Sequence, residues 1–113
     1  MPFINSKISI KITKEQEEKI KTRLGQAISL IPGKSETWLM VGFEDEYSLY
    51  FKGKSGEIAF IEVKIFGKAP KNAYDDLTAA ICDIYNEEIG IDKDKIYVKY
   101  EEVENWGFNG SNF

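Results

Sequence analysis

The sequence lacks histidine, has a single cysteine and contains no long run of apolar residues. Without histidine, neither an imidazole-based zinc site nor a histidine-dependent catalytic triad has its parts. Because Cys82 has no partner cysteine, an internal disulfide is excluded. No apolar stretch approaches the roughly 20 residues that a membrane-spanning helix needs, and the N-terminus has no basic start followed by an apolar signal core. We therefore expect a cytoplasmic protein with no metal site and no membrane partner.

The chain also has fewer basic residues than acidic ones, 15 against 19. The formal net charge is -4, and the lysines are scattered along the chain instead of forming a stripe that could follow phosphates. Nucleic acid is therefore not an expected partner. With 113 residues, 42% of them hydrophobic and 30% charged, the composition predicts one globular domain over residues 1–113. A domain of this size buries only about two-thirds of its surface, so stability is expected to depend partly on partner chains.

Two long segments have helical periodicity. The first begins at Thr13, where Gln16 three residues on completes a capping box, and it ends at Pro32-Gly33. Its apolar residues at helical spacing are Ile20, Leu24, Ala27, Ile28 and Ile31. The second covers residues 70–88 and ends near Gly90. Each helix has one apolar face, so each should pack on a sheet through that face.

Five short segments have β-rich composition: residues 2–10, 37–43, 47–51, 57–66 and 95–100. The order is strand, helix, strand, short hairpin-like strand, strand, helix, strand. This order predicts an α/β fold made of a doubled βαβ unit, with a four-stranded mixed sheet and both helices on one face.

The segment 57–66 (EIAFIEVKIF) is apolar on both sides of the expected strand. Ile58, Phe60 and Phe66 point one way, and the opposite side is also apolar. The residues of that opposite side are Ala59, Ile61, Val63 and Ile65. Two helices can cover only one face of the sheet, so we expect oligomerisation to cover the other. The aromatic C-terminus, WGFNGSNF at residues 106–113, is expected to pack at the same subunit boundary.

Chemistry is expected near the start of the chain. Removal of Met1 would leave Pro2 with a free secondary amine held at a strand end, although Met-Pro is more often simply an ordinary start. An α-amino group titrates near ~7.7 to 8.0, and burial near Tyr97, Trp106 and Phe108 with Lys34 close by would lower that pKa. Lys34 could alternatively complement a helix dipole, and Tyr97 could be an ordinary sheet residue.

Several motifs together resemble one family. The segments MPFI, GK after the first helix, IFGK, KIYVKY and the terminal WGFNGSNF are similar, end to end, to the macrophage migration inhibitory factor family of the tautomerase superfamily. The resemblance implies a homotrimer with an active site at each subunit boundary. It also implies keto–enol tautomerisation of aromatic 2-oxo acids such as phenylpyruvate, and of dopachrome-like compounds, without a cofactor.

The same resemblance assigns roles to single residues. Pro2 matches the catalytic base. The matching substrate-binding positions are Lys34, Ile65, Phe66, Tyr97, Lys99, Trp106 and Phe108. Lys34 would bind the substrate carboxylate, Phe66 would present its backbone amide, and Tyr97 would come from the adjacent subunit. Lys99 replaces an asparagine of the family and favours a dianionic ligand, while the bulk of Phe66 predicts a narrower pocket.

Other features set limits on this interpretation. The Cys-x-x-Cys of the mammalian protein is replaced by Ile58 and Ile61, so thiol-disulfide activity is not expected. A rival reading is a signalling protein that binds a host cell-surface receptor with vestigial catalysis, which would need release by an unconventional route. A third is a trimeric scaffold that binds a metabolite without turnover. In any chain that keeps Met1, the Pro2 nitrogen is an amide and cannot act as a base.

Overall fold

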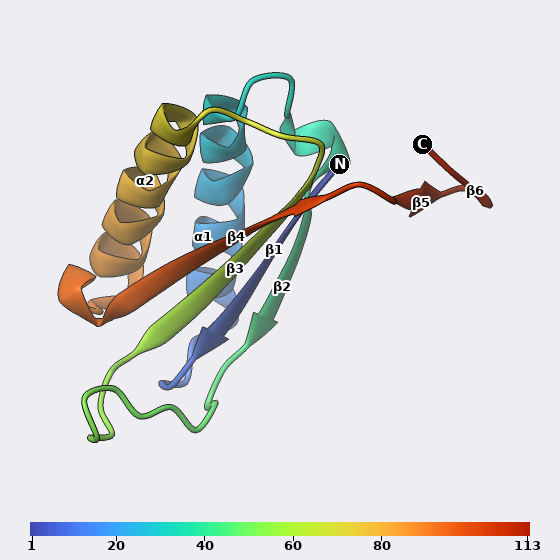
Figure 1. The fold of residues 1–113 in the computed structure, drawn as a ribbon. Coiled ribbons are helices and arrows are strands. Elements are labelled where there is room, and N and C mark those ends of the chain that lie inside the picture. Colours follow the sequence, from blue (N-terminus) through green and yellow to red (C-terminus); the bar gives the residue numbers. More distant parts are fainter.

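The computed structural model describes residues 1–113 as a four-stranded mixed sheet with two helices on one face (Figure 1). The main elements are β1 (Pro2–Ile8), α1 (Lys14–Ala27), β2 (Met40–Glu44), β3 (Ala59–Phe66), α2 (Lys71–Ile89) and β4 (Ile96–Val103). The shorter elements are the 3-10 turns η1 (Ile28–Leu30), η2 (Glu36–Trp38) and η3 (Lys93–Lys95), with the strands β5 (Gly107–Phe108) and β6 (Ser111–Asn112).

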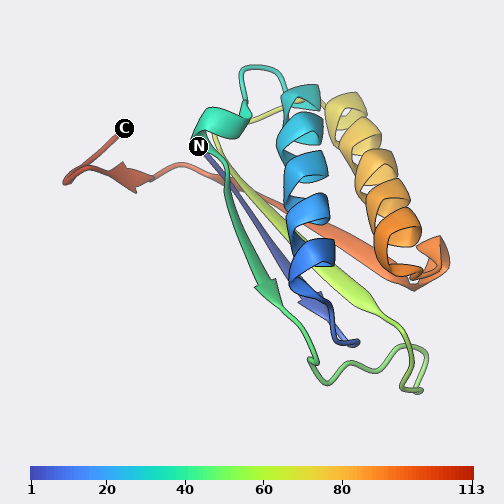
Figure 2. The same cartoon turned by 180° about the vertical axis from the view of Figure 1, so that it is seen from behind.

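The sheet order is β2-β1-β3-β4. The outer pairs β1–β2 and β3–β4 are parallel, whereas the central pair β1–β3 is antiparallel. One helix connects the strands of each parallel pair, and both helices cover the same face (Figure 2). The predicted doubled βαβ architecture is therefore confirmed.

The helix ends follow the sequence signals. The Thr13 hydroxyl accepts a hydrogen bond from the Gln16 backbone N–H at 3.1 Å, and the Gln16 side chain accepts one from the Thr13 N–H at 2.9 Å. At the same end of the helical layer, Gly90 adopts a φ of 72° and ends α2, because glycine takes this left-handed conformation without a Cβ clash. No helix combines the length and hydrophobicity needed to cross a membrane.

The core lies between the sheet and the two helices. It contains almost only aliphatic side chains, among them Ile4 of β1, Leu24 of α1, Ile61 of β3 and Ile81 of α2, all fully buried. Ser6 is the one buried polar residue, and its hydroxyl is hydrogen-bonded to that of Tyr85. Every buried polar side-chain atom has a hydrogen-bond partner.

The predicted strand at 47–51 is wrong. Only an isolated bridge between Phe51 and Lys54 forms there. Lys52 and Gly53 have φ values of 53° and 76°, which reverse the chain directly after Phe51. The segment is therefore a surface loop at the opposite end of the sheet from the N-terminus (Figure 1).

The predicted strand at 37–43 begins later than expected. Residues 36–38 form the turn η2, so β2 starts at Met40.

The prediction that both sides of the 57–66 strand are apolar also needs correction. On the open face of β3, Glu62 and Lys64 lie between Phe60 and Phe66, and Glu62 pairs with Lys7 at 3.1 Å. The uncovered face is thus aromatic at its ends and charged in its middle.

Candidate active site

A cleft of about 490 Å³ lies beside the N-terminus, where β1 begins next to η2. Pro2 and Phe3 of β1 line it together with Trp38 and Met40, and the C-terminal segment supplies Trp106 and Phe108. Seven of the ten residues that line it are hydrophobic. Such a lining suits the apolar part of a small ligand.

Pro2 is held rigidly at this cleft. It is buried, and it lies opposite Ile65 in the antiparallel ladder between β1 and β3. The backbone N–H of Phe66 donates to the Met1 carbonyl oxygen at 3.0 Å, which continues the ladder by one hydrogen bond. The first residues of the chain are thus part of the sheet and not a loose end.

Lys34 reaches the same corner. It follows Gly33, whose φ of 79° ends the connection after η1, and its Nζ donates to the Phe66 carbonyl oxygen at 2.8 Å. The last turn of α1 contains no basic residue, so Lys34 does not serve as a dipole partner of that helix. The pKa of the Met1 amine is lowered from 8.0, first by burial and second by the positive charge and contact of Lys34.

An aromatic cluster begins at the cleft residues Trp38 and Phe108 and continues to Phe113 and Phe66. Trp38 and Phe108 meet edge to face, with ring centroids 5.3 Å apart, and Phe113 lies 5.7 Å from Phe66. The tail forms the hairpin β5–β6, which is fixed by the hydrogen bond from the Phe113 N–H to the Trp106 carbonyl at 3.0 Å. The aromatic C-terminus therefore has a defined place next to the N-terminus.

The remaining proposed binding residues lie elsewhere. Ile65 is only 1% exposed and points into the core, so only its main chain is near Pro2. Tyr97 lies opposite Phe60, five positions along β3 from Ile65, which corresponds to roughly 17 Å. Lys99 lies opposite Glu62, and its Nζ pairs with Glu101 at 3.0 Å.

Within one chain, Tyr97 and Lys99 do not reach the cleft. Tyr97 is 60% exposed and packs edge to face against Phe51 of the surface loop, with centroids 5.1 Å apart. Its hydroxyl could approach Pro2 only if it came from a second copy of the chain.

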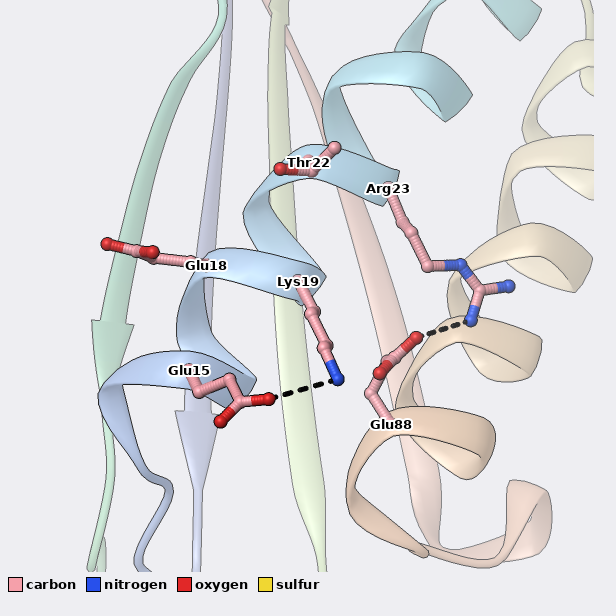
Figure 3. A pocket seen from close by; sticks show the side chains of 6 residues that line it. All are labelled: Glu15, Glu18, Lys19, Thr22, Arg23 and Glu88. Atoms are coloured by element: carbon pink, nitrogen blue, oxygen red, sulfur yellow. Dashed lines mark hydrogen bonds and ion pairs between the residues drawn. The ribbon is translucent and has the colours of Figure 1, made fainter.

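Another hollow, of about 390 Å³, lies on the outer side of the two helices and has a different character (Figure 3). No hydrophobic residue lines it, and four of its five charged residues pair with one another. Lys19 pairs with Glu15 at 3.3 Å, and Arg23 with Glu88 at 3.0 Å (Figure 3). These contacts stabilise the helical layer, and the hollow offers no surface for an aromatic ligand.

No cluster of metal-ligating side chains is found in the chain.

The sequence interpretation missed one wall of the cleft. Thr37, Trp38 and Leu39 line it, because η2 places this segment beside Pro2. The available signal was the apolar run WLM at residues 38–40, directly after the Lys34 turn. The sequence analysis included that run in the strand expected at residues 37–43.

Comparisons with known proteins give one consistent result. The family model described as macrophage migration inhibitory factor matches residues 1–113. A macrophage migration inhibitory factor protein of Leishmania major has a similar structure, with a TM-score of 0.94 and 26% identity over 100% of this chain and 97% of that one. Homologues from Entamoeba histolytica and Prochlorococcus marinus each have a TM-score of 0.88 and 25% identity, and at least 98% of every chain is covered. The search of curated proteins gave no match.

Proposed function

Since the chain belongs to the macrophage migration inhibitory factor family of the tautomerase superfamily, we propose that it is a cofactor-independent keto–enol tautomerase. The proposed substrates are aromatic 2-oxo acids of the phenylpyruvate type, with dopachrome-like compounds as further candidates. Removal of Met1 is required, because only then does Pro2 carry a basic amine.

The proposed reaction needs one proton carrier. The neutral Pro2 nitrogen takes a proton from C3 of the ketone, and negative charge develops on the 2-oxygen. The same nitrogen then returns the proton to that oxygen, so that the enol forms and the amine is neutral again. Lys34 would pair with the substrate carboxylate, and Trp38 and Phe108 would pack against the aromatic ring.

One observation carries the proposal: a strand-anchored Pro2 and aromatic side chains line a single cleft, and the Lys34 ammonium lies beside the N-terminus, where it donates to the Phe66 carbonyl. The Met1 amine at the same corner has a lowered pKa, and we expect the Pro2 amine to be affected in the same direction once Met1 is removed, which suits a base that must be unprotonated at neutral pH. We further propose that the chain forms a homotrimer, in which Tyr97 of a neighbouring copy completes each site. The exposure of Tyr97 supports this arrangement.

The decisive experiment is phenylpyruvate tautomerisation by protein whose intact mass shows that Met1 is absent. Replacing the base, Pro2→Gly, should lower kcat/KM by about 100-fold or more, as expected for the loss of a positioned acid–base group. Pro70→Gly is the matched control, because Pro70 lies outside the cleft at the start of α2. It should retain the activity.

Absence of turnover in the Met1-free wild type would contradict the tautomerase proposal. It would favour a role in ligand binding or in receptor binding outside the cell.

A further inference from the structure

The tip of the C-terminal hairpin is a tight turn made of asparagine and glycine. Phe108 of β5 pairs with Ser111 of β6, which leaves only Asn109 and Gly110 between the two strands. Their φ values are 52° and 89°, and two positive φ angles in succession are typical of the type I′ turn, for which Asn-Gly is a preferred sequence. Both residues are exposed to solvent. The same two residues also carry chemistry that the fold does not need.

An asparagine followed by glycine has an electrophile and a nucleophile on adjacent residues. The backbone nitrogen of Gly110 can attack the side-chain amide carbon of Asn109, because the ring that closes is five-membered. Every residue except glycine has a Cβ that hinders this approach, so Gly110 leaves its nitrogen accessible. None of the other asparagines of the chain precedes a glycine, and these are Asn5, Asn72, Asn86, Asn105 and Asn112.

The hairpin holds this pair only weakly. It is a separate two-stranded sheet with two residues in each strand, and it projects away from the main sheet and the helices (Figure 1). Because a two-stranded hairpin has marginal stability of its own, the turn opens locally and samples the geometry that ring closure needs. Two other asparagines are held by regular structure. Asn5 of β1 donates to Glu44 at 2.8 Å. Asn86 of α2 donates to the Ile91 carbonyl at 3.1 Å.

We propose that Asn109 is a site of spontaneous deamidation, and that its isoaspartate product releases Phe108 from the cleft. In the first step the Gly110 nitrogen bonds to Cγ of Asn109 and loses its proton, while the bond from Cγ to the side-chain nitrogen breaks and ammonia leaves. Water then adds to one of the two carbonyls of the cyclic imide and opens the ring. Opening at the side-chain carbonyl gives aspartate, and opening at the main-chain carbonyl gives isoaspartate. The two steps consume one water and release one ammonia, with no change in oxidation state.

Isoaspartate alters the main chain as well as the charge. Its backbone passes through the former side chain, so the two-residue loop gains one main-chain atom, and the pairing of Phe108 with Ser111 no longer fits. Phe108 lines the cleft, and its ring meets that of Trp38 with centroids 5.3 Å apart. Deamidation therefore removes an aromatic contact of the cleft and adds a negative charge next to Phe108. This inference does not depend on the reaction proposed above.

The test follows wild-type protein during incubation at neutral and at mildly alkaline pH in water enriched in heavy oxygen. Peptide mapping by mass spectrometry measures aspartate and isoaspartate at each asparagine. We expect Asn109 to be converted roughly 10-fold or more faster than Asn105 and Asn112 of the same segment, with isoaspartate among the products and heavy oxygen incorporated. Conversion should be faster at the alkaline pH, because the Gly110 amide loses its proton in the first step.

Two variants separate the cause from the consequence. Gly110→Asn adds a Cβ that meets no atom within 4 Å, and asparagine tolerates a positive φ better than most residues, so conversion at Asn109 should fall roughly 10-fold while the turn still forms. Asn109→Asp carries the charge without the extra main-chain atom. It should keep the contact between the Trp38 and Phe108 rings, which NMR detects, whereas purified isoaspartate protein should lose it.

Conversion at Asn109 no faster than at Asn105 and Asn112, or an unchanged rate in Gly110→Asn, would overturn the proposed site. Aspartate as the only product would overturn the proposed effect on the cleft, as would a Trp38–Phe108 contact that survives in isoaspartate protein. Loss of that contact in Asn109→Asp would assign the effect to charge and contradict the role of the extra main-chain atom.

Discussion

Among single residues, Lys34 has the clearest electrostatic effect on the proposed chemistry. Burial and the neighbouring Lys34 charge both lower the pKa of the N-terminal amine. After Met1 removal, the Pro2 amine is at the same corner, so its pKa should also lie below the ordinary range of ~7.7 to 8.0. A lowered pKa leaves the amine neutral, and therefore basic, at a lower pH.

Replacing this charge should move the pH–rate profile. In Lys34→Gln the ammonium form of Pro2 loses a like-charged neighbour, so its pKa should rise and the rising limb of kcat/KM should shift to higher pH. At the Met1 amine burial is the larger cause of the lowered pKa, so we expect the same order at Pro2 and only a partial shift. Lys34→Arg keeps the charge and serves as the control. A midpoint that stays in place or falls in Lys34→Gln would show that Lys34 does not tune the base.

The buried pair Ser6–Tyr85 is expected to stabilise the junction of β1 with α2. Burial raises the pKa of the Tyr85 hydroxyl, which stays protonated and needs a partner in the apolar core. Ser6→Ala or Tyr85→Phe leaves one hydroxyl unsatisfied, and each should lower the free energy of unfolding by about 1–3 kcal/mol. The double variant should lose less than the sum of the two. Urea unfolding measures all four proteins, and strict additivity would mean that the hydroxyls are not coupled.

Among the elements, α1 depends on its N-terminal cap. Thr13→Ala removes the acceptor for the Gln16 N–H and should cost about 1 kcal/mol of stability. Thr13→Ser retains the hydroxyl and should stay near the wild type in thermal or urea unfolding. If Thr13→Ser lost as much as Thr13→Ala, the contribution would come from the methyl group and not from the cap.

The helices and the four sheet strands could be predicted from the sequence, because periodicity, capping residues and Gly90 are local signals. The loop conformation of segment 47–51 could not be predicted. Its aromatic residues are typical of a strand, but Phe51 packs on Tyr97 at the end of the sheet. The lining of the cleft was partly predictable: Pro2, Trp106 and Phe108 line it, and Lys34 lies beside the Met1 amine, while their roles remain predictions. Trp38 was missed because its position depends on a 3-10 turn that has no strong sequence signature.

Across the whole molecule, the open sheet face shows what a single chain leaves incomplete. The ion pairs Lys7–Glu62 and Lys99–Glu101 let the middle of this face remain hydrated. Its aromatic ends include Tyr97, which is too far from the cleft of its own chain to act there. No sequence signal within one chain gives the position of a residue from another chain, so the proposed contribution of Tyr97 has to be tested on the assembly.

The proposed shared site can be tested by mixing two inactive variants. Pro2→Gly chains lack the base but keep Tyr97, whereas Tyr97→Ala chains keep the base. If each site combines Pro2 of one chain with Tyr97 of the next, co-refolding at equal amounts should restore both groups in about a quarter of the sites of a cyclic trimer. Activity should then exceed that of either variant alone, and it should return to the baseline when the variants are refolded separately and mixed without exchange.

If co-refolding restores nothing while light scattering shows mixed trimers, Tyr97 does not complete the site of a neighbour. A monomeric mass at micromolar concentration would exclude the trimer itself.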